Sequence, residues 1–155
     1  MASDARVILL QGQLLDAPKA ASAIGLRGSE LVTIEDPTEV VSVLDHARRR
    51  GAPFRLLLVD TSNERVRAAV LLRMVTQRYG EIASVVLAAR GEDEEMRNAL
   101  GSGADDFLVG PVDERELGLR CQRLLGSTAG RSRPQRKRKP RKSDVLIGGA
   151  EWIKG

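Results

Sequence analysis

The chain has 155 residues, enough for one ordinary domain, and 42% of them are hydrophobic, so one apolar core can form. A single cysteine and a single histidine exclude an internal disulfide and argue against a structural zinc site. No apolar run approaches the ~20 residues that a membrane-spanning helix requires, and no signal-peptide pattern follows Met1. We therefore expect a cytoplasmic protein that does not insert into membranes and has no metal ion or cofactor.

The net charge of +4 is unevenly distributed along the chain. Residues 1–126 carry 16 basic and 19 acidic side chains, whereas residues 127–155 carry 9 basic and 2 acidic ones. The second segment is also rich in Gly, Ser and Pro, a composition that favours disorder. We therefore divide the chain into a domain, residues 1–126, and a basic tail or linker, residues 127–155.

Short apolar or β-branched runs bounded by polar or turn residues predict the buried strands of a parallel sheet. Five segments have this pattern: Arg6–Leu10, Glu30–Ile34, Phe54–Val59, Ser84–Ala88 and Phe107–Val109.

Helical patterns separate these runs. Asp36 and Pro37 supply an N-cap and a first-turn proline, and Glu39 is placed to reach back to the cap. The first crossover, roughly residues 14–26, has the weakest helical pattern because it is short and ends in glycines. Apolar spacing predicts the remaining helices around Val66, Val70 and Met74, around Met96, Ala99 and Leu100, and around Leu117, Cys121, Leu124 and Leu125.

The alternation of strands and helices predicts a doubly wound α/β domain with a five-stranded parallel sheet, because parallel strands need crossover connections. Sites in such sheets lie beyond the carboxyl ends of the strands. The segments to inspect are therefore Gln11–Gln13, Asp60–Asn63, Ala88–Arg90 and Gly110–Pro111.

The segment Gly103–Asp113 reads GADDFLVGPVD and resembles the GADDYLTKPFD signature of response-regulator receiver domains. With the order of strands and helices, the resemblance covers roughly residues 5–125 and implies the receiver, or flavodoxin-like, architecture. It also implies phosphoryl transfer to an aspartate at the end of the third strand. Mg²⁺ is held there by this aspartate and an acidic pair, and a hydroxyl residue and a lysine contact the phosphoryl group.

By this resemblance Asp60 occupies the phosphoacceptor position, but the residues that would support it are replaced. Gln11 and Gly12 stand at the acidic pair, so the metal position loses two carboxylates. Ala88 replaces the hydroxyl residue, and Gly110 replaces the lysine. Restoring only the hydroxyl and the lysine should therefore not restore phosphotransfer.

We interpret the chain as a noncatalytic pseudo-receiver, a protein-interaction module of bacterial signal transduction or cellular organisation, and not as an enzyme. Asp60 would then cap backbone donors near Thr61–Asn63. Phe107 matches the switch aromatic of the family, but Ala88 breaks the hydroxyl–aromatic relay. Two alternatives remain: a response regulator still phosphorylated at Asp60, or the N-terminal regulatory domain of a transcription activator.

Three further features have ordinary structural interpretations. The acidic run Glu92–Glu95 complements the dipole at a helix start and is not expected to bind metal. His46 lies in a helical stretch with no partner suggested by the sequence, so we expect it to be solvated. Cys121 falls on an apolar helix stripe and is expected to be a core residue and not a nucleophile.

The resemblance implies a protein partner, or a second copy in a homodimer, on the face of the fourth helix, fifth strand and fifth helix, roughly residues 93–125. We interpret the basic tail as a solvated linker or a segment that contacts the acidic domain, and the alternative is contact with nucleic acid or another polyanion. The tail also holds Leu146–Gly148, an LIG motif that weakly resembles the entry to the ATPase module of enhancer-binding activators. The alternative is that this segment is a partner-binding peptide anchored by Trp152. The candidate polyanion contacts are Arg131, Arg133, Arg136, Lys137, Arg138, Lys139, Arg141 and Lys142.

Overall fold

The computed structural model describes residues 6–128, and these form a five-stranded parallel sheet in the order β2-β1-β3-β4-β5. The fold is the one predicted from the sequence. The strands are β1 (Val7–Leu10), β2 (Leu31–Ile34), β3 (Leu56–Asp60), β4 (Ala83–Ala88) and β5 (Asp106–Val109).

Five α-helices connect or follow the strands. Asp16 caps the first helix by accepting a hydrogen bond from the Lys19 backbone amide. The helices are α1 (Ala17–Ile24), α2 (Val40–Arg49), α3 (Ala68–Arg78), α4 (Asp93–Gly101) and α5 (Glu114–Thr128).

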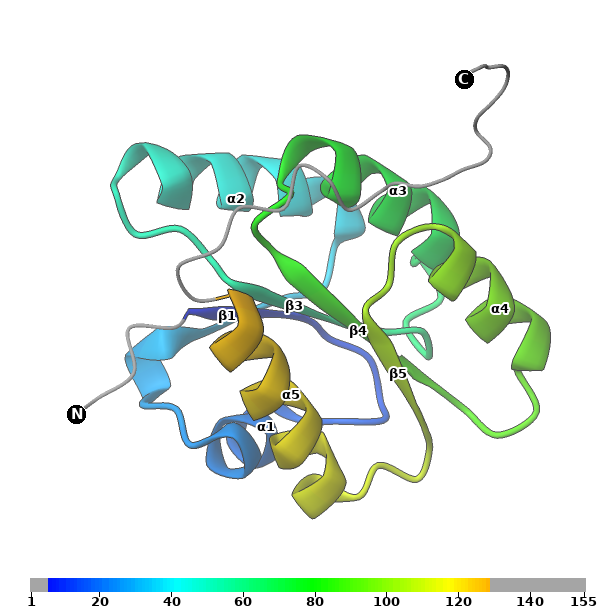
Figure 1. Ribbon diagram of the computed structural model, residues 1–155. Helices are drawn as coiled ribbons and strands as arrows, with labels where there is room; N and C mark the ends of the chain where they lie inside the picture. The colour runs from blue at the N-terminus through cyan, green and yellow to red at the C-terminus, as the bar shows by residue number, and fades with distance from the viewer. Residues whose placement is uncertain (1–5, 129–155) are drawn as a thin grey trace, which may run out of the picture.

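The sheet is covered on both faces, α1 and α5 packing on one and α2, α3 and α4 on the other (Figure 1). Alternate residues of each strand enter different cores. Leu10 and Val59 pack with α2 and α3 in one core. Leu9 and Leu58 pack with α1 and α5 in the other. Strands buried on both faces therefore read as the continuous apolar runs seen in the sequence.

Some helical details differ from the sequence-based predictions. Val70 was expected on the buried stripe of α3 but is 61% exposed, because the helix turns Leu71, Leu72 and Val75 toward the core instead. The turn that Asp36 caps is a short 3₁₀ helix, Pro37–Glu39, so α2 itself begins only at Val40. In that turn the Asp36 side chain accepts from the Thr38 amide, and no hydrogen bond from the Asp36 amide to the Glu39 side chain is found among the described residues.

The last described element, α5, includes residues 127 and 128, which the sequence analysis assigned to the tail. The tail residues predicted to contact polyanions, the LIG motif and Trp152 all lie outside the described residues. Within residues 6–128, no helix combines the length and the apolar composition needed to cross a membrane.

The contact between α1 and α5 depends on a residue without a side chain. A Cβ atom at Gly118 would overlap the carbonyl oxygen of Ala23 and lie 3.2 Å from the carbonyl carbon. Gln122, one turn further along α5, donates a hydrogen bond from Nε2 to the carbonyl oxygen of Ile24. The two helices therefore touch through backbone at Gly118 and are tied by a side chain at Gln122.

We predict that Gly118→Ala destabilises the domain by about 1–3 kcal/mol, because the added methyl group forces the helices apart. Gly126→Ala is the matched control, since Gly126 lies in the same helix with nothing near the added Cβ. That change should be neutral or stabilise the domain by up to ~1 kcal/mol through helix propensity. Urea unfolding of both variants measures the difference. Equal effects at the two positions would contradict the close packing at Gly118.

Candidate functional site

The carboxyl ends of four neighbouring strands bring the segments selected from the sequence to one edge of the sheet. Leu10 is paired in register with Val59, Asp60 with Leu87, and Ala88 with Val109. The segments that follow these strands are therefore adjacent in space although they are far apart in the sequence. The Gly110 amide donates to the Ala88 carbonyl oxygen at 2.6 Å, which fixes the end of β5 against β4.

Asp60, the last residue of β3, is 0% exposed, and both of its carboxylate oxygens accept hydrogen bonds. Oδ2 accepts from the backbone amides of Leu14 at 2.8 Å and Leu15 at 3.3 Å. Oδ1 accepts from the Ser62 amide at 3.0 Å and from the Ser62 hydroxyl at 2.7 Å. The carboxylate thus joins the loop after β1 to the loop after β3.

The loop after β1 lies directly on this carboxylate. A Cβ atom at Gly12 would come within 2.7 Å of Asp60 Cγ, 2.5 Å of Ser62 Oγ and 2.8 Å of the Asn63 nitrogen. Real side chains do not make such approaches to backbone atoms, so this position accommodates only glycine in the present loop conformation. The aspartate and the loop above it are in direct contact.

Ser62 and Asn63 complete the connection between the two loops. The Ser62 hydroxyl accepts from the Gln13 amide at 2.6 Å while donating to Asp60. The Asn63 side chain donates to the carbonyl oxygens of Gln11 and Glu35, each at 2.8 Å. The predicted capping of donors near residues 61–63 is present at Ser62, but the amides of Leu14 and Leu15 were not anticipated.

These bridging roles had a partial sequence signal. Ser and Asn directly after a strand-ending aspartate are residues that form local turns through their side chains. That pattern identifies a turn at Ser62 and Asn63. It does not identify the partner loop, because the two loops are separated by about fifty residues in the chain.

The loop after β4 is tied to the same edge by Glu92. Its Oε1 accepts from the Ala89 amide at 3.1 Å and from the Thr61 hydroxyl at 3.2 Å. The same hydroxyl lies 2.8 Å from the carbonyl oxygen of Leu87, so its single proton is shared between the two acceptors. Glu92, the first residue of the acidic run, therefore holds two loops together just before α4 begins.

The hydroxyl and lysine positions of the family are occupied by aliphatic packing. Ala88 is fully buried. A Cβ atom at Gly110 would lie 3.3 Å from Leu14 Cδ2, so the Leu14 side chain borders the space that a longer residue would enter. Phe107, at the switch position, is half-buried and packs against the core beneath α2 and α3.

The residues at this edge do not fit the magnesium ion that the receiver architecture implies. Gln11 contributes its carbonyl oxygen to Asn63, and Gly12 has no side chain. Among residues 6–128, no three His, Cys, Asp or Glu side chains are grouped so that they could hold a metal ion. A hard divalent cation prefers several anionic oxygens, and here the one buried carboxylate is already bonded to amides and a hydroxyl.

A shallow polar cleft of about 320 Å³ opens beside this edge, but Asp60 does not line it. Ser62 and Asn63 lie between the carboxylate and the cleft in the hydrogen-bond network described above. The remaining lining residues are Gln11, Gly12, Gln13, Glu35, Glu64 and Arg65.

Two other candidates from the sequence occupy ordinary positions. Cys121 is fully buried on α5, and burial raises the pKa of its thiol to about 12, with a further contribution from the charge of Asp106. The reactive thiolate is therefore scarce at neutral pH. His46 is exposed on α2 and lines a separate pocket beside that helix.

The face formed by α4, β5 and α5 combines an ion pair with exposed apolar side chains. Arg120 donates to both oxygens of Asp106, at 2.7 and 2.9 Å, and to Glu116 at 2.8 Å. The hydrogen bonds to Asp106 and then to Glu116 raise the pKa of Arg120. Leu100, Val109 and Leu119 are 41%, 39% and 66% exposed and come one each from α4, β5 and α5.

No protein-family model matches the chain, but curated proteins do. The response regulator protein PmrA of Pseudomonas aeruginosa is 28% identical over 130 residues, which is 84% of this chain and 57% of PmrA. The CpxR homolog of Haemophilus influenzae, a transcriptional regulatory protein, is 26% identical over 72% of this chain and 46% of its own length. The chain thus spans about half the length of these relatives.

Solved structures show the same fold. The receiver domain of NtrX from Brucella abortus superposes with a TM-score of 0.65 at 22% identity, covering 78% of this chain and 98% of that domain. A CheY-like receiver domain protein from Methanospirillum hungatei superposes with a TM-score of 0.68 at 16% identity, covering 82% and 98% of the two chains. The chain therefore has the fold of a response-regulator receiver domain and is similar in sequence to curated response regulators.

Proposed function

We propose that this domain is a pseudo-receiver, which binds a protein partner in bacterial two-component signalling without accepting a phosphoryl group. The observation that carries the proposal is the state of Asp60, buried with amide or hydroxyl donors on both carboxylate oxygens. We further propose that the domain acts in the cytoplasm.

Phosphoryl transfer would require one Asp60 oxygen to leave its donors and approach the phosphorus of a donor molecule. That movement breaks the hydrogen bonds from the amides of Leu14 and Leu15, or those from the amide and hydroxyl of Ser62. Each hydrogen bond to a charged group contributes about 1.5–3 kcal/mol, so the movement is costly. No cation would compensate the developing charge at Gly110, and no acidic pair would hold Mg²⁺ at Gln11 and Gly12. The activation barrier to phosphorylation of Asp60 is therefore raised, and the groups that would stabilise the transition state are missing.

The position of Gly12 makes this state hard to reverse by simple substitution. An aspartate at residue 12 would place its Cβ against Asp60, Ser62 and Asn63, so it requires the whole loop to lift. We therefore infer that the loss of the acidic pair and the closure of the loop on Asp60 depend on each other.

The α4–β5–α5 face supports the binding half of the proposal. Leu100, Val109 and Leu119 expose apolar surface on three adjacent elements, and the Asp106–Arg120 pair holds β5 against α5 without phosphorylation. The partner we test is a second copy of the chain, because self-association can be measured with the purified protein alone.

We predict that acetyl phosphate or beryllofluoride with Mg²⁺ leaves the protein unmodified and its structure unchanged. Intact mass measurement detects a phosphoryl adduct, and amide NMR spectra detect beryllofluoride binding. A conventional receiver treated in parallel provides the positive control. Stoichiometric modification that disappears in Asp60→Asn would overturn the proposal.

The same assay, applied to variants that restore the family's residues, distinguishes the effect of the missing chemical groups from the effect of the closed loop. Ala88→Thr with Gly110→Lys should remain unmodified, because the metal position still has no acidic pair. Adding Gln11→Asp and Gly12→Asp supplies the acids but must also displace the loop, so we expect lower stability together with any gain in Mg²⁺ binding. Strong Mg²⁺ binding by the unmodified protein would contradict this reasoning.

We predict that Asp60→Asn lowers the free energy of unfolding by about 2–3 kcal/mol, because an amide NH₂ would face backbone donors where a carboxylate oxygen now accepts. The matched control is Asp16→Asn, the same chemical change at an exposed helix cap, where Asn serves equally well. Urea unfolding measures both variants. A neutral Asp60→Asn change would mean that the carboxylate does not fasten the loops.

For the binding face, we predict that the protein self-associates and that Leu119→Arg reduces this association at least about tenfold, since burying an unpaired charge is costly. Val70→Arg makes the same change at a similarly exposed apolar residue on α3 and should leave the association unchanged. Sedimentation equilibrium provides the measurement. A monomeric parent would exclude a second copy as the partner, and a dimer insensitive to Leu119→Arg would exclude this face.

A further inference from the structure

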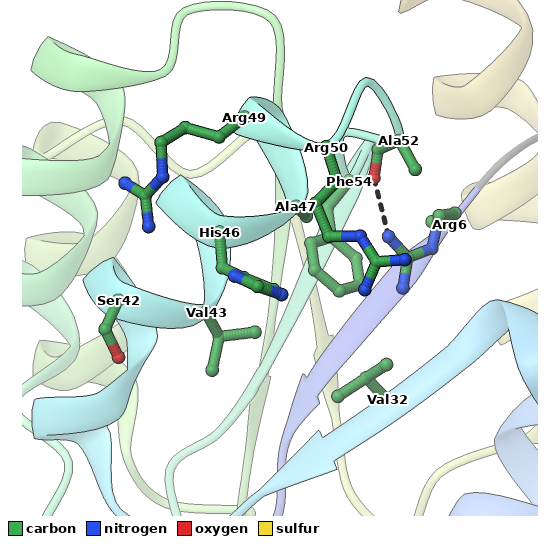
Figure 2. Close-up of a pocket in the computed structure, with 10 residues that line it drawn as sticks. All are labelled: Arg6, Val32, Ser42, Val43, His46, Ala47, Arg49, Arg50, Ala52 and Phe54. Carbon is green, nitrogen blue, oxygen red and sulfur yellow. Dashed lines mark hydrogen bonds between the residues drawn. The ribbon is translucent and has the colours of Figure 1, made fainter.

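A second pocket, of about 740 Å³, lies against α2 (Figure 2), and none of the residues described at the Asp60 edge lines it. It is bounded by α2 from Ser42 to its C-terminal end, by Val32 of β2, and by residues that precede β1 and β3, namely Arg6, Ala52 and Phe54. Its volume falls within the range of about 300–1,000 Å³ that is typical of small-molecule sites. Nothing in the receiver chemistry considered above uses it.

The rim of the pocket is positively charged although residues 1–126 carry more acidic than basic side chains. Arg6, Arg49 and Arg50 line it together with His46, and none of its lining residues is acidic. The ion pairs found among residues 6–128 involve none of these three arginines. Their charges are therefore not neutralised by a carboxylate within the described domain.

The dipole of α2 explains only part of this arrangement. Arg49 and Arg50 lie at the C-terminal end of the helix, where basic side chains are favoured. Arg6 comes from a different element, immediately before β1, yet Figure 2 shows its side chain at the same end of the pocket as that of Arg50. Two guanidinium groups that approach the same region repel each other unless an anion lies between them.

Arg6 is held in place before any ligand binds. Its Nη1 donates to the Ala52 carbonyl oxygen at 2.6 Å, and its guanidinium carbon lies 4.4 Å from the centroid of the Phe54 ring. The Phe54 ring is itself buried, so this stacking fixes the arginine against the core. A guanidinium has five N–H donors, and its planar edge suits the oxygens of a phosphate group.

The floor of the pocket is apolar. Val32 of β2 and Val43 and Ala47 of α2 line it between the charged groups. A free inorganic anion would use the arginines but not this floor. The pocket therefore suits a molecule with phosphate groups at one end and a ring or apolar portion at the other.

We propose that this pocket binds an organic polyphosphate of nucleotide size, with its phosphate groups at Arg6 and Arg50 and its ring portion against Val32 and Val43. This site is independent of the fate of Asp60, and the proposal stands whether or not the domain is phosphorylated. Binding would connect α2 to the first residues of β1 and β3, which the pocket brings together.

The test is a titration of the full chain with ATP in EDTA, followed by calorimetry and by amide NMR. We expect saturable binding, with resonance changes concentrated in residues 42–54. Arg50→Glu should weaken the affinity at least about tenfold. Arg97→Glu, the same charge reversal at an exposed arginine of α4, should not, and both variants keep the basic tail as a common background.

Sodium tripolyphosphate tests the contribution of the phosphate groups without that of the ring portion. It should bind the same residues about tenfold more weakly than ATP, because it cannot use the apolar floor. Equal affinity would overturn the role of Val32 and Val43. Absence of ATP binding, equal losses in Arg50→Glu and Arg97→Glu, or resonance changes elsewhere would overturn the proposed site.

Discussion

The hydrogen bonds of the Asp60 carboxylate determine how the loops at the carboxyl edge of the sheet are arranged. A buried carboxylate requires donors on its free lone pairs, and here the amides of Leu14, Leu15 and Ser62 supply them together with the Ser62 hydroxyl. The loop after β1 must therefore come down onto β3. Glycine at position 12 permits that approach.

The other features of the edge follow from this constraint. Once the loop after β1 is fixed, Asn63 can bridge to the carbonyl oxygens of Gln11 and Glu35, and Leu14 lies where a side chain at Gly110 would project. Glu92 adds the loop after β4 through Thr61 and Ala89. Each bond is modest on its own, but the loops share partners, so disturbing one of them exposes polar groups of the others.

The chemistry of one aspartate thus depends on what surrounds it. The same residue at the end of the third strand can accept a phosphoryl group where a metal ion, a lysine and a hydroxyl share the developing charge. Where amides occupy its oxygens, it stabilises the fold instead. The proposed organic phosphate pocket would give the domain a ligand-responsive element at a different place, since Arg6 and Phe54, which precede β1 and β3, line it together with α2.

The amino-acid sequence by itself determined the α/β architecture, because buried parallel strands need continuous apolar runs and the crossover helices need their own caps and stripes. It also identified Asp60 and the substitutions at Gln11, Gly12, Ala88 and Gly110, because a motif fixes positions along the chain. Which face of α3 is buried was predicted incorrectly, since Val70 and Leu71 are both apolar and only packing decides between them. The hydrogen bonds from Leu14 and Leu15 to Asp60 and the convergence of Arg6 with Arg50 were decided by tertiary structure alone. Both depend on contacts between segments more than forty residues apart, which no local pattern of residues encodes.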